Sequence, residues 1–95
     1  MLGLSSFQTH MLFVISGNEK PHGLAIKSTL NDVIDDDVNH GRLYPNLDEL
    51  VEDGYLEKGD LDRRTNYYEL TEYGEEQLDE YINWLQEQRK ISIET

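Results

Sequence analysis

Cysteine is absent from the sequence, which excludes disulfide bonds, zinc sites built on thiolates and thiol-based redox sensing. Long apolar runs are also missing, since no stretch approaches the roughly 18 consecutive apolar residues of a membrane span. The first residues have neither the basic region nor the apolar run of a signal peptide. We therefore expect a soluble, cytoplasmic protein without a membrane partner. Its 95 residues suffice for one small domain but not for a two-domain enzyme.

Basic residues are scarce, with eight lysines and arginines against 20 acidic residues and a net charge of -12. Such a balance ordinarily argues against a nucleic-acid partner, because phosphate binding rests on Lys and Arg. The acids are spread along the whole chain, however, as in proteins of extreme halophiles, whose carboxylate-covered surface stays solvated at high salt. Salt cations at the acidic surface are then expected partners. An acidic protein that binds a basic partner is the alternative.

Motifs for catalysis, cofactors and metals are missing as well. The three histidines, His10, His22 and His40, belong to no zinc-binding or nucleophile motif, and no glycine-rich phosphate loop is present. The acidic run at 35–37 lacks the alternating acids, glycine and final glutamate of an EF-hand, so we interpret it as a solvated loop. We expect His22 to cap or pack at a helix. The sequence therefore predicts no enzyme, no cofactor and no metal site.

Apolar residues at spacings of three and four predict three helices in the first half of the chain. The first begins at a cap at Ser5 or Ser6 and ends at residues 17–18. The second opens with Pro21 in its first turn and stops at the acidic run. The apolar faces of these two helices are Leu4, Phe7, Met11, Val14 and Ile15 in the first, and Ile26, Leu30 and Val33 in the second.

The third predicted helix starts near Asn39 and ends at Gly54. Val38 and Leu43 stand at the positions of a hydrophobic staple at its start. Pro45 removes a backbone hydrogen bond and crowds the preceding turn, so we expect an irregular first turn or a kink there. The residues of this helix that face inward are Leu43, Leu47 and Leu50.

The second half of the chain predicts a hairpin and a final helix. Residues 55–58 and 65–70 are typical of short strands, with Tyr68 and Leu70 on one face and a polar loop at 59–64 between them. The final helix is capped by Thr71, has acidic residues near its N-terminus, and runs to about Lys90. The predicted fold is mainly α with a small β-hairpin (α+β), in the order of a winged helix-turn-helix.

Four blocks of sequence, in order, carry a resemblance: residues 21–26 (PHGLAI), 41–47 (GRLYPNL), 50–56 and 63–74. Together they resemble the PadR family of transcriptional regulators over roughly residues 9–80. The resemblance implies a homodimeric winged-helix repressor that binds double-stranded DNA at an inverted-repeat operator. It also implies a DNA-binding domain at 1–71 and a C-terminal dimerisation helix at 72–95, packed on the same domain.

The short C-terminal part and the acidity are typical of a haloarchaeal member of this family. The size and the cysteine-free composition are similar to those of members that regulate the oxidative-stress response. A winged helix that contacts only other proteins, without binding DNA, is the alternative function.

The third helix has candidate DNA contacts on the face turned away from its leucines. Arg42 and Asn46 are four residues apart there, and their side chains can pair with guanine and adenine respectively. Asn39 and His40, at the helix start, can bond phosphates or base edges. Asn39 can equally serve as a helix cap alone. Tyr44 either reaches the DNA backbone or packs inside.

Arg63 and Arg64 form the densest positive charge of the chain and fall at the predicted hairpin tip, flanked by Thr65 and Asn66. This pattern predicts a wing that grips phosphates or the minor groove. Surface ion pairs of both arginines with nearby aspartates, Asp60 and Asp62, are the alternative. Lesser phosphate contacts are expected on the second helix, at Lys27 and Ser28.

The final helix has more apolar surface than a lone terminal helix needs. We therefore predict a subunit interface there, with help from the first helix, and the alternative is that the stripe only packs on its own domain. The predicted interface residues are Leu4, Phe7, Leu78, Tyr81, Ile82, Trp84 and Leu85.

Overall fold

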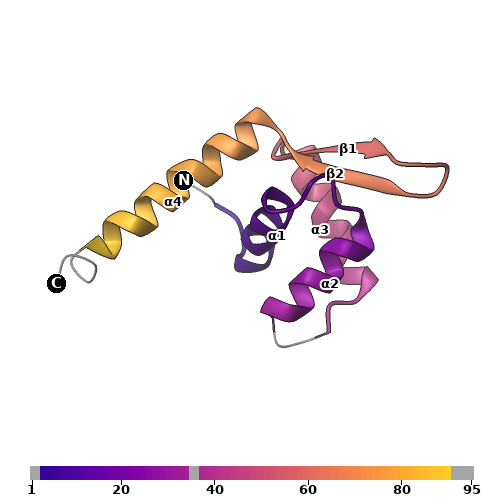
Figure 1. Cartoon of the computed structure of the whole chain (residues 1–95), viewed down its shortest axis with the longest axis horizontal. Helices are drawn as coiled ribbons and strands as arrows, with labels where there is room; N and C mark the ends of the chain where they lie inside the picture. The colour runs from indigo at the N-terminus through magenta and orange to yellow at the C-terminus, as the bar shows by residue number, and fades with distance from the viewer. Residues whose placement is uncertain (1–2, 35–36, 91–95) are drawn as a thin grey trace.

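Three helices, a β-hairpin and a long final helix follow one another in the computed structural model, which describes residues 3–34 and 37–90 (Figure 1). Asp35 and Asp36 of the acidic run lie outside the described residues. The order confirms the predicted winged helix. The elements are α1 (Ser6–Ser16), α2 (Gly23–Val33), α3 (His40–Glu52), β1 (Leu56–Asp60), β2 (Asn66–Leu70) and α4 (Glu72–Gln88).

Polar side chains cap the helices at the positions that the sequence predicts. The side chains of Ser5, Asn39 and Thr71 each accept a hydrogen bond from a backbone N–H in the first turn of α1, α3 and α4. In α2 the cap is His22, whose Nδ1 accepts from the Ala25 N–H at 3.1 Å. Pro21 therefore precedes the helix, and its predicted place in the first turn is wrong. Its carbonyl accepts instead from the Tyr68 N–H of the wing.

One apolar core joins α1, α2, α3, the hairpin and the start of α4. Val38 and Leu43 are both buried, in agreement with the predicted staple. The prediction is wrong for Val33, which is 61% exposed, because α2 ends at this residue and Ile34 packs against the core in its place. The largest fully buried side chains are Tyr68, Met11, Leu12, Ile26, Leu30, Leu43, Leu47, Leu50, Leu56 and Val38.

Pro45 lies inside α3 without interrupting it. The first turn keeps its cap and the Leu43 N–H donates to the Asn39 carbonyl at 3.0 Å, so the expected irregular first turn is wrong. The bond that proline removes is the one to the Gly41 carbonyl. Because Gly41 is exposed, water can satisfy that carbonyl.

The hairpin is longer in its first strand than the sequence predicts. β1 and β2 pair antiparallel with Leu56 opposite Leu70 and Gly59 opposite Tyr67, which leaves residues 61–65 as the tip. The sequence places Gly59 in the loop, but it is a strand residue that pairs with Tyr67, whose ring lies where a β-carbon of residue 59 would stand. Tyr67 also forms an isolated bridge with His22, which ties the base of the wing to the connection between α1 and α2.

Beyond the hairpin, α4 projects away from the three-helix body (Figure 1). Its first turn is fixed by Thr71, whose hydroxyl donates to the Gly54 carbonyl at 2.6 Å and whose N–H donates to the Tyr55 carbonyl at 3.1 Å. Leu78 is the last residue of α4 that is buried in the core. Within the described ranges, no helix combines the length and the hydropathy required to cross a bilayer.

Candidate nucleic-acid interface

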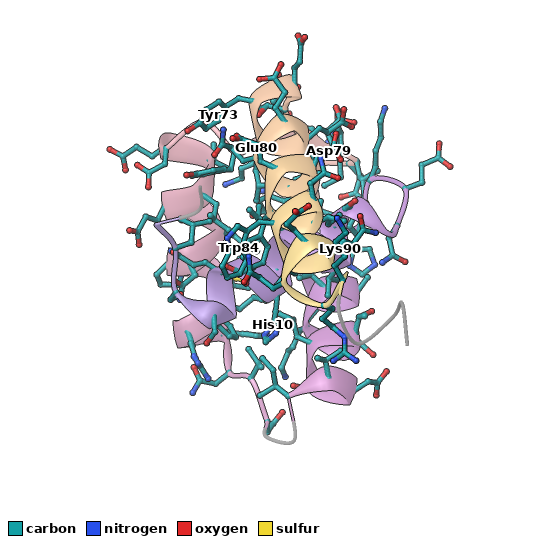
Figure 2. The ribbon with its side chains drawn as sticks, turned by 90° about the vertical axis from the view of Figure 1, so that its left-hand side faces the viewer. His10, Tyr73, Asp79, Glu80, Trp84 and Lys90 are labelled. Carbon is teal, nitrogen blue, oxygen red and sulfur yellow. The ribbon has the colours of Figure 1, made fainter. Side chains whose placement is uncertain are left out.

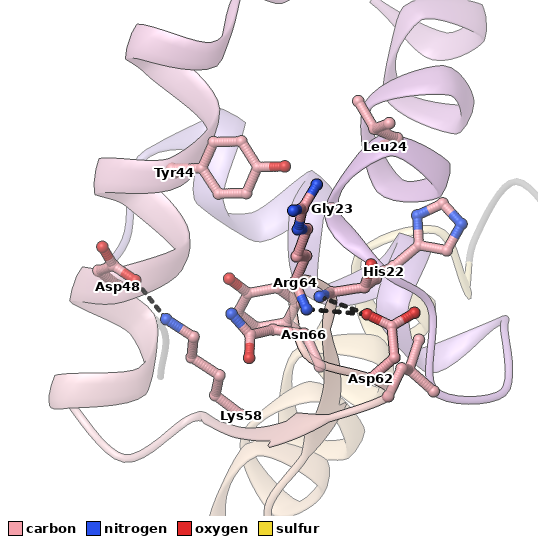
Figure 3. Close-up of a pocket in the computed structure, with 12 residues that line it drawn as sticks. His22, Gly23, Leu24, Tyr44, Asp48, Lys58, Asp62, Arg64 and Asn66 are labelled. Atoms are coloured by element: carbon pink, nitrogen blue, oxygen red, sulfur yellow. Dashed lines mark hydrogen bonds and ion pairs between the residues drawn. The ribbon is translucent and has the colours of Figure 1, made fainter.

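A hollow of about 630 Å³ opens between the N-terminal end of α2, the middle of α3 and the wing (Figure 3). In a winged helix, the third helix is the one that enters the major groove of DNA, so this hollow lies beside the expected recognition surface. Its lining residues are His22, Gly23, Leu24, Tyr44, Asp48, Lys58, Leu61, Asp62, Arg64, Thr65, Asn66 and Tyr68.

Arg42 and Asn46 both contact α1, so the face of α3 that the sequence predicts to be free is partly occupied, although Arg42 is exposed. The Arg42 guanidinium stands over the Phe7 ring, 3.9 Å from its centroid. The Asn46 carbonyl oxygen accepts from Gln8 Nε2 at 3.1 Å, and its amide nitrogen donates to the Arg42 carbonyl at 2.7 Å. Both polar groups of Asn46 are therefore engaged within the subunit. The prediction that this residue is free to meet adenine is corrected accordingly, because Gln8 is a buried partner that helical spacing cannot reveal.

The start of α3 combines capping with exposure. The Asn39 side chain accepts from the Arg42 N–H at 2.9 Å, so it caps the helix, and only its amide nitrogen is left to contact DNA. His40 is exposed and its ring meets that of Tyr44 edge to face at 5.7 Å. Tyr44 packs partly against the core, and its hydroxyl end lies close to Gly23 at the start of α2. Tyr44 therefore packs inside, and its ring also lines the hollow.

Arg63 and Arg64 are exposed on the wing, and neither side chain forms an ion pair with any residue that the structure describes. The alternative that they pair with Asp60 and Asp62 is thus not observed. Asp62 uses one carboxylate oxygen to accept from the backbone N–H groups of Arg64 and Thr65, each at 2.9 Å. Figure 3 shows Arg64 extending from the wing between α2 and α3.

The turn at Asp62 orders the wing tip, and its protonation state matters. The Arg64 N–H, helped by Thr65, holds the pKa of the Asp62 carboxyl below its ordinary value of 3.8. Because the pKa is lowered, the ionised carboxylate stabilises the folded tip. This stabilisation is fully present above pH 3.8 and is lost as the pH falls through the folded-state pKa. The tip therefore keeps this turn at neutral pH.

Two substitutions of Asp62 separate the effect of its charge on DNA binding from the effect of the turn that its carboxylate orders. Asp62→Asn and Asp62→Ala remove the same charge, but only asparagine keeps an oxygen that can accept from both N–H groups. We expect Asp62→Asn to bind duplex DNA more tightly than Asp62→Ala, by roughly fivefold, if an ordered tip positions Arg64. Fluorescence anisotropy measures the affinities, and hydrogen exchange of the Arg64 and Thr65 amides reports the turn. Equal affinities of the two variants would show that tip order is irrelevant.

Lys27 and Ser28 lie on α2, where they were expected. Lys27 is partly buried and pairs with Asp37 at a long 3.9 Å, whereas Ser28 is exposed. Thr65 and Asn66 are half-buried and line the hollow. Within residues 3–34 and 37–90, no group of three or more His, Asp or Glu side chains is placed to hold a metal ion.

The sequence did not indicate most of the residues that line the hollow, among them Asp48, Lys58 and His22, the last of which was expected only to cap or pack at a helix. Asp48 and Lys58 form an ion pair at 3.7 Å, from α3 to β1 across the hollow. The spacing of four between Tyr44 and Asp48 was the available signal for Asp48, because it places both on one face of α3.

A second surface runs along α4 and the start of α1. Tyr81 stacks on Trp84 with ring centroids 6.3 Å apart, and Tyr81 also contacts Phe13 of α1. Trp84 is 44% exposed and Leu85 is 39% exposed. Figure 2 looks from the side on which α4 ends and shows Trp84 and Lys90 on opposite flanks of the helix. We call Leu4, Tyr81, Ile82, Trp84 and Leu85 the α4 patch.

Phe7 and Leu78 correct the predicted subunit interface. Phe7 is 6% exposed beneath Arg42, and Leu78 is 3% exposed in the core. Both side chains are buried by their own subunit and have almost no surface for a partner. The interface prediction therefore rests on the α4 patch alone.

Comparisons with known proteins agree with this geometry. The family model described as "Transcriptional regulator PadR-like family" matches residues 11–80. A structure of RosR, described as the complex hsRosR-S1, is 42% identical, with a TM-score of 0.88 over 97% of this chain and 87% of that one. A second structure, of RosR from H. salinarum and described as grown from NaBr, is 41% identical. Its TM-score is 0.88 over 98% of this chain and 89% of that one.

A more distant structure shows the same fold. A transcriptional regulator from Clostridium thermocellum is 18% identical, with a TM-score of 0.67 over 93% of this chain and 90% of that one. The comparison with curated proteins gives no match.

Proposed function

Because the chain belongs to the PadR-like family of transcriptional regulators, and is thus a DNA-binding regulator and no enzyme, we propose that it is a homodimeric repressor of an inverted-repeat operator. In this proposal α3 enters the major groove, the wing holds the adjacent backbone, and α4 joins the two subunits. Residues 1–71 form the DNA-binding domain and 72–95 the dimerisation helix, of which 91–95 lie outside the described residues. We also propose a role in the stress response, which the size and the cysteine-free composition support.

One observation carries the proposal. In a chain with a net charge of -12, the two adjacent arginines of the wing tip stand exposed and without an acidic partner in the described structure, beside the recognition helix. Exposed guanidinium groups beside α3 suit phosphate oxygens, which accept charge-assisted hydrogen bonds.

Affinity for duplex DNA as a function of salt tests the proposal. Above about 1 M KCl the Debye length is roughly 3 Å, so long-range attraction to phosphate nearly vanishes and contacts at short range must carry recognition. We propose that the affinity falls less steeply than about -0.9 per phosphate contact on a log–log scale, because cations also screen the carboxylates of this surface. Anisotropy with a random duplex from about 0.1 M to 1 M KCl measures this slope. A steep, monotonic loss would contradict salt adaptation, and no binding at any salt would favour a protein-binding module.

The α4 patch provides a test of the dimer. Trp84→Ala removes its largest exposed ring, so we expect the dissociation constant of the dimer to rise by at least about tenfold, since an aromatic anchor in an interface is commonly worth 2 kcal/mol or more. Sedimentation velocity over a range of concentrations measures the change. Tyr73→Ala is the matched control, because Tyr73 is similarly exposed at 47% but contacts Tyr55 near the wing. An unchanged dimer would remove Trp84 from the interface.

A further inference from the structure

An exposed carboxylate of α3 lines the hollow beside the expected recognition surface. Asp48 lies one turn after Tyr44, lines the hollow, and is 62% exposed. Among the described residues its ion-pair partner is Lys58 of β1, whose Nζ lies 3.7 Å away (Figure 3). Asp62, the other acid of the hollow, differs because two backbone N–H groups engage its carboxylate.

The chemistry of DNA limits what a carboxylate can do in this position. Phosphates and most groove atoms repel it, since guanine N7 and O6 and thymine O4 are all acceptors. Among the groups exposed in the major groove, the N4 amino group of cytosine is the donor that Asp and Glu side chains pair with. A carboxylate here therefore weakens binding in general and favours sites with cytosine beneath it.

Lys58 can reduce the repulsion between Asp48 and DNA without removing the preference for cytosine. In the free protein it neutralises Asp48 across the hollow, and its side chain is 39% exposed, so it is free to turn. A long ion pair between exposed groups contributes little stability, and exchanging it for a phosphate contact is therefore cheap.

We propose that Asp48 selects cytosine in the operator, accepting a hydrogen bond from its N4 amino group, and that Lys58 exchanges Asp48 for a phosphate when DNA binds. The proposal rests on the proposed function, because it requires α3 to lie in the major groove. It adds a base preference and a neutralising partner that the wing arginines do not provide.

Selection from a pool of random duplexes tests the base preference. The wild type, Asp48→Asn and Glu49→Gln are each used to enrich bound sequences. Glu49 is the matched control, since it is exposed on the same helix but does not line the hollow. We expect the wild type and Glu49→Gln to enrich one motif with a cytosine in each half-site. The motif enriched by Asp48→Asn should lack that cytosine or have adenine in its place, because asparagine pairs with adenine.

Affinities for the enriched duplex make the expectation quantitative. Changing the cytosine to another base should lower the affinity of the wild type for the duplex by about tenfold and that of Asp48→Asn by less than about twofold. Asp48→Ala, a second variant at this exposed position, should show the same loss of discrimination. If both variants keep the wild-type motif and discrimination, this proposal fails while the proposed function stands. If the wild type enriches no motif, the proposed function fails as well.

The lysine is tested by Lys58→Gln. Loss of a phosphate contact weakens all sequences alike and makes the salt dependence less steep by about one contact. We therefore expect a several-fold lower affinity for the enriched and the random duplex, with the cytosine preference intact. A variant that binds both duplexes as the wild type does would overturn the exchange of Lys58 from Asp48 to phosphate.

Discussion

Gly74→Ala should destabilise the protein by about 3 kcal/mol, which for a domain of this size lowers the melting temperature by more than about 12 °C. The sign is opposite to the usual effect, because alanine inside a helix normally stabilises relative to glycine by roughly 0.5–1 kcal/mol. At Gly74 an added β-carbon would overlap the Tyr55 carbonyl oxygen, which is backbone and cannot turn aside. The helix start must then move away from the turn at residues 54–55.

That movement would break several bonds together. The Thr71 hydroxyl caps α4 by accepting from the Gly74 N–H at 2.9 Å and donates to the Gly54 carbonyl at 2.6 Å. The Thr71 N–H donates to the Tyr55 carbonyl that the new methyl group would displace. Loss of this docking therefore costs the cap as well as the packing.

Gly17→Ala is the control for Gly74→Ala. Gly17 ends α1 with φ -83°, and a β-carbon there would lie 3.6 Å from the Phe13 carbonyl oxygen, an ordinary contact. We expect its stability to stay within about 0.5 kcal/mol of the wild type. Urea and thermal unfolding at one protein concentration measure both variants, since the stability of the proposed dimer would depend on concentration. A Gly74→Ala protein as stable as the wild type would contradict the docking of α4 on Tyr55.

The elements of this fold could be predicted because local signals agree with the tertiary structure. The side chains of Ser5, Asn39 and Thr71 each satisfy an N–H at a helix start, which is a property of the adjacent residues alone. The predicted boundaries of helices and strands were wrong where a contact with a residue far away in the sequence determines the local structure. Gly59 is a strand residue because it pairs with Tyr67 opposite it, and Pro21 lies outside α2, where its carbonyl bonds to the wing.

The residues of the candidate site show the same difference between local patterns and contacts that are distant in sequence. The wing arginines are adjacent in sequence and fall at a turn, so their exposure followed from local pattern. Asn46 was misplaced because its partner, Gln8, lies on another helix, 38 residues away. Asp48 and Lys58 meet only because β1 crosses beside α3, and helical periodicity contains no information about that pairing.

Replacing Arg63 and Arg64 together by glutamine should lower the affinity for duplex DNA by at least about 100-fold. Each charge-assisted hydrogen bond to phosphate contributes roughly 1.5–3 kcal/mol, and 1.4 kcal/mol corresponds to a factor of ten. Few other bases are available to compensate, because the chain has only eight lysines and arginines. The salt dependence should become less steep by about 0.9 for each phosphate contact that is lost.

The matched control is Arg89→Gln with Lys90→Gln. These residues are also adjacent and exposed, but they lie at the end of α4, far along the chain from the wing. Both double variants change the net charge by the same amount, so a general electrostatic effect would weaken both alike. We expect the control to bind within about threefold of the wild type, because rim charges away from the contact act mainly at long range. Equal losses would mean that the wing has no contact with DNA and that total charge alone governs binding, whereas a loss confined to the wing variant places the phosphate contact at the tip.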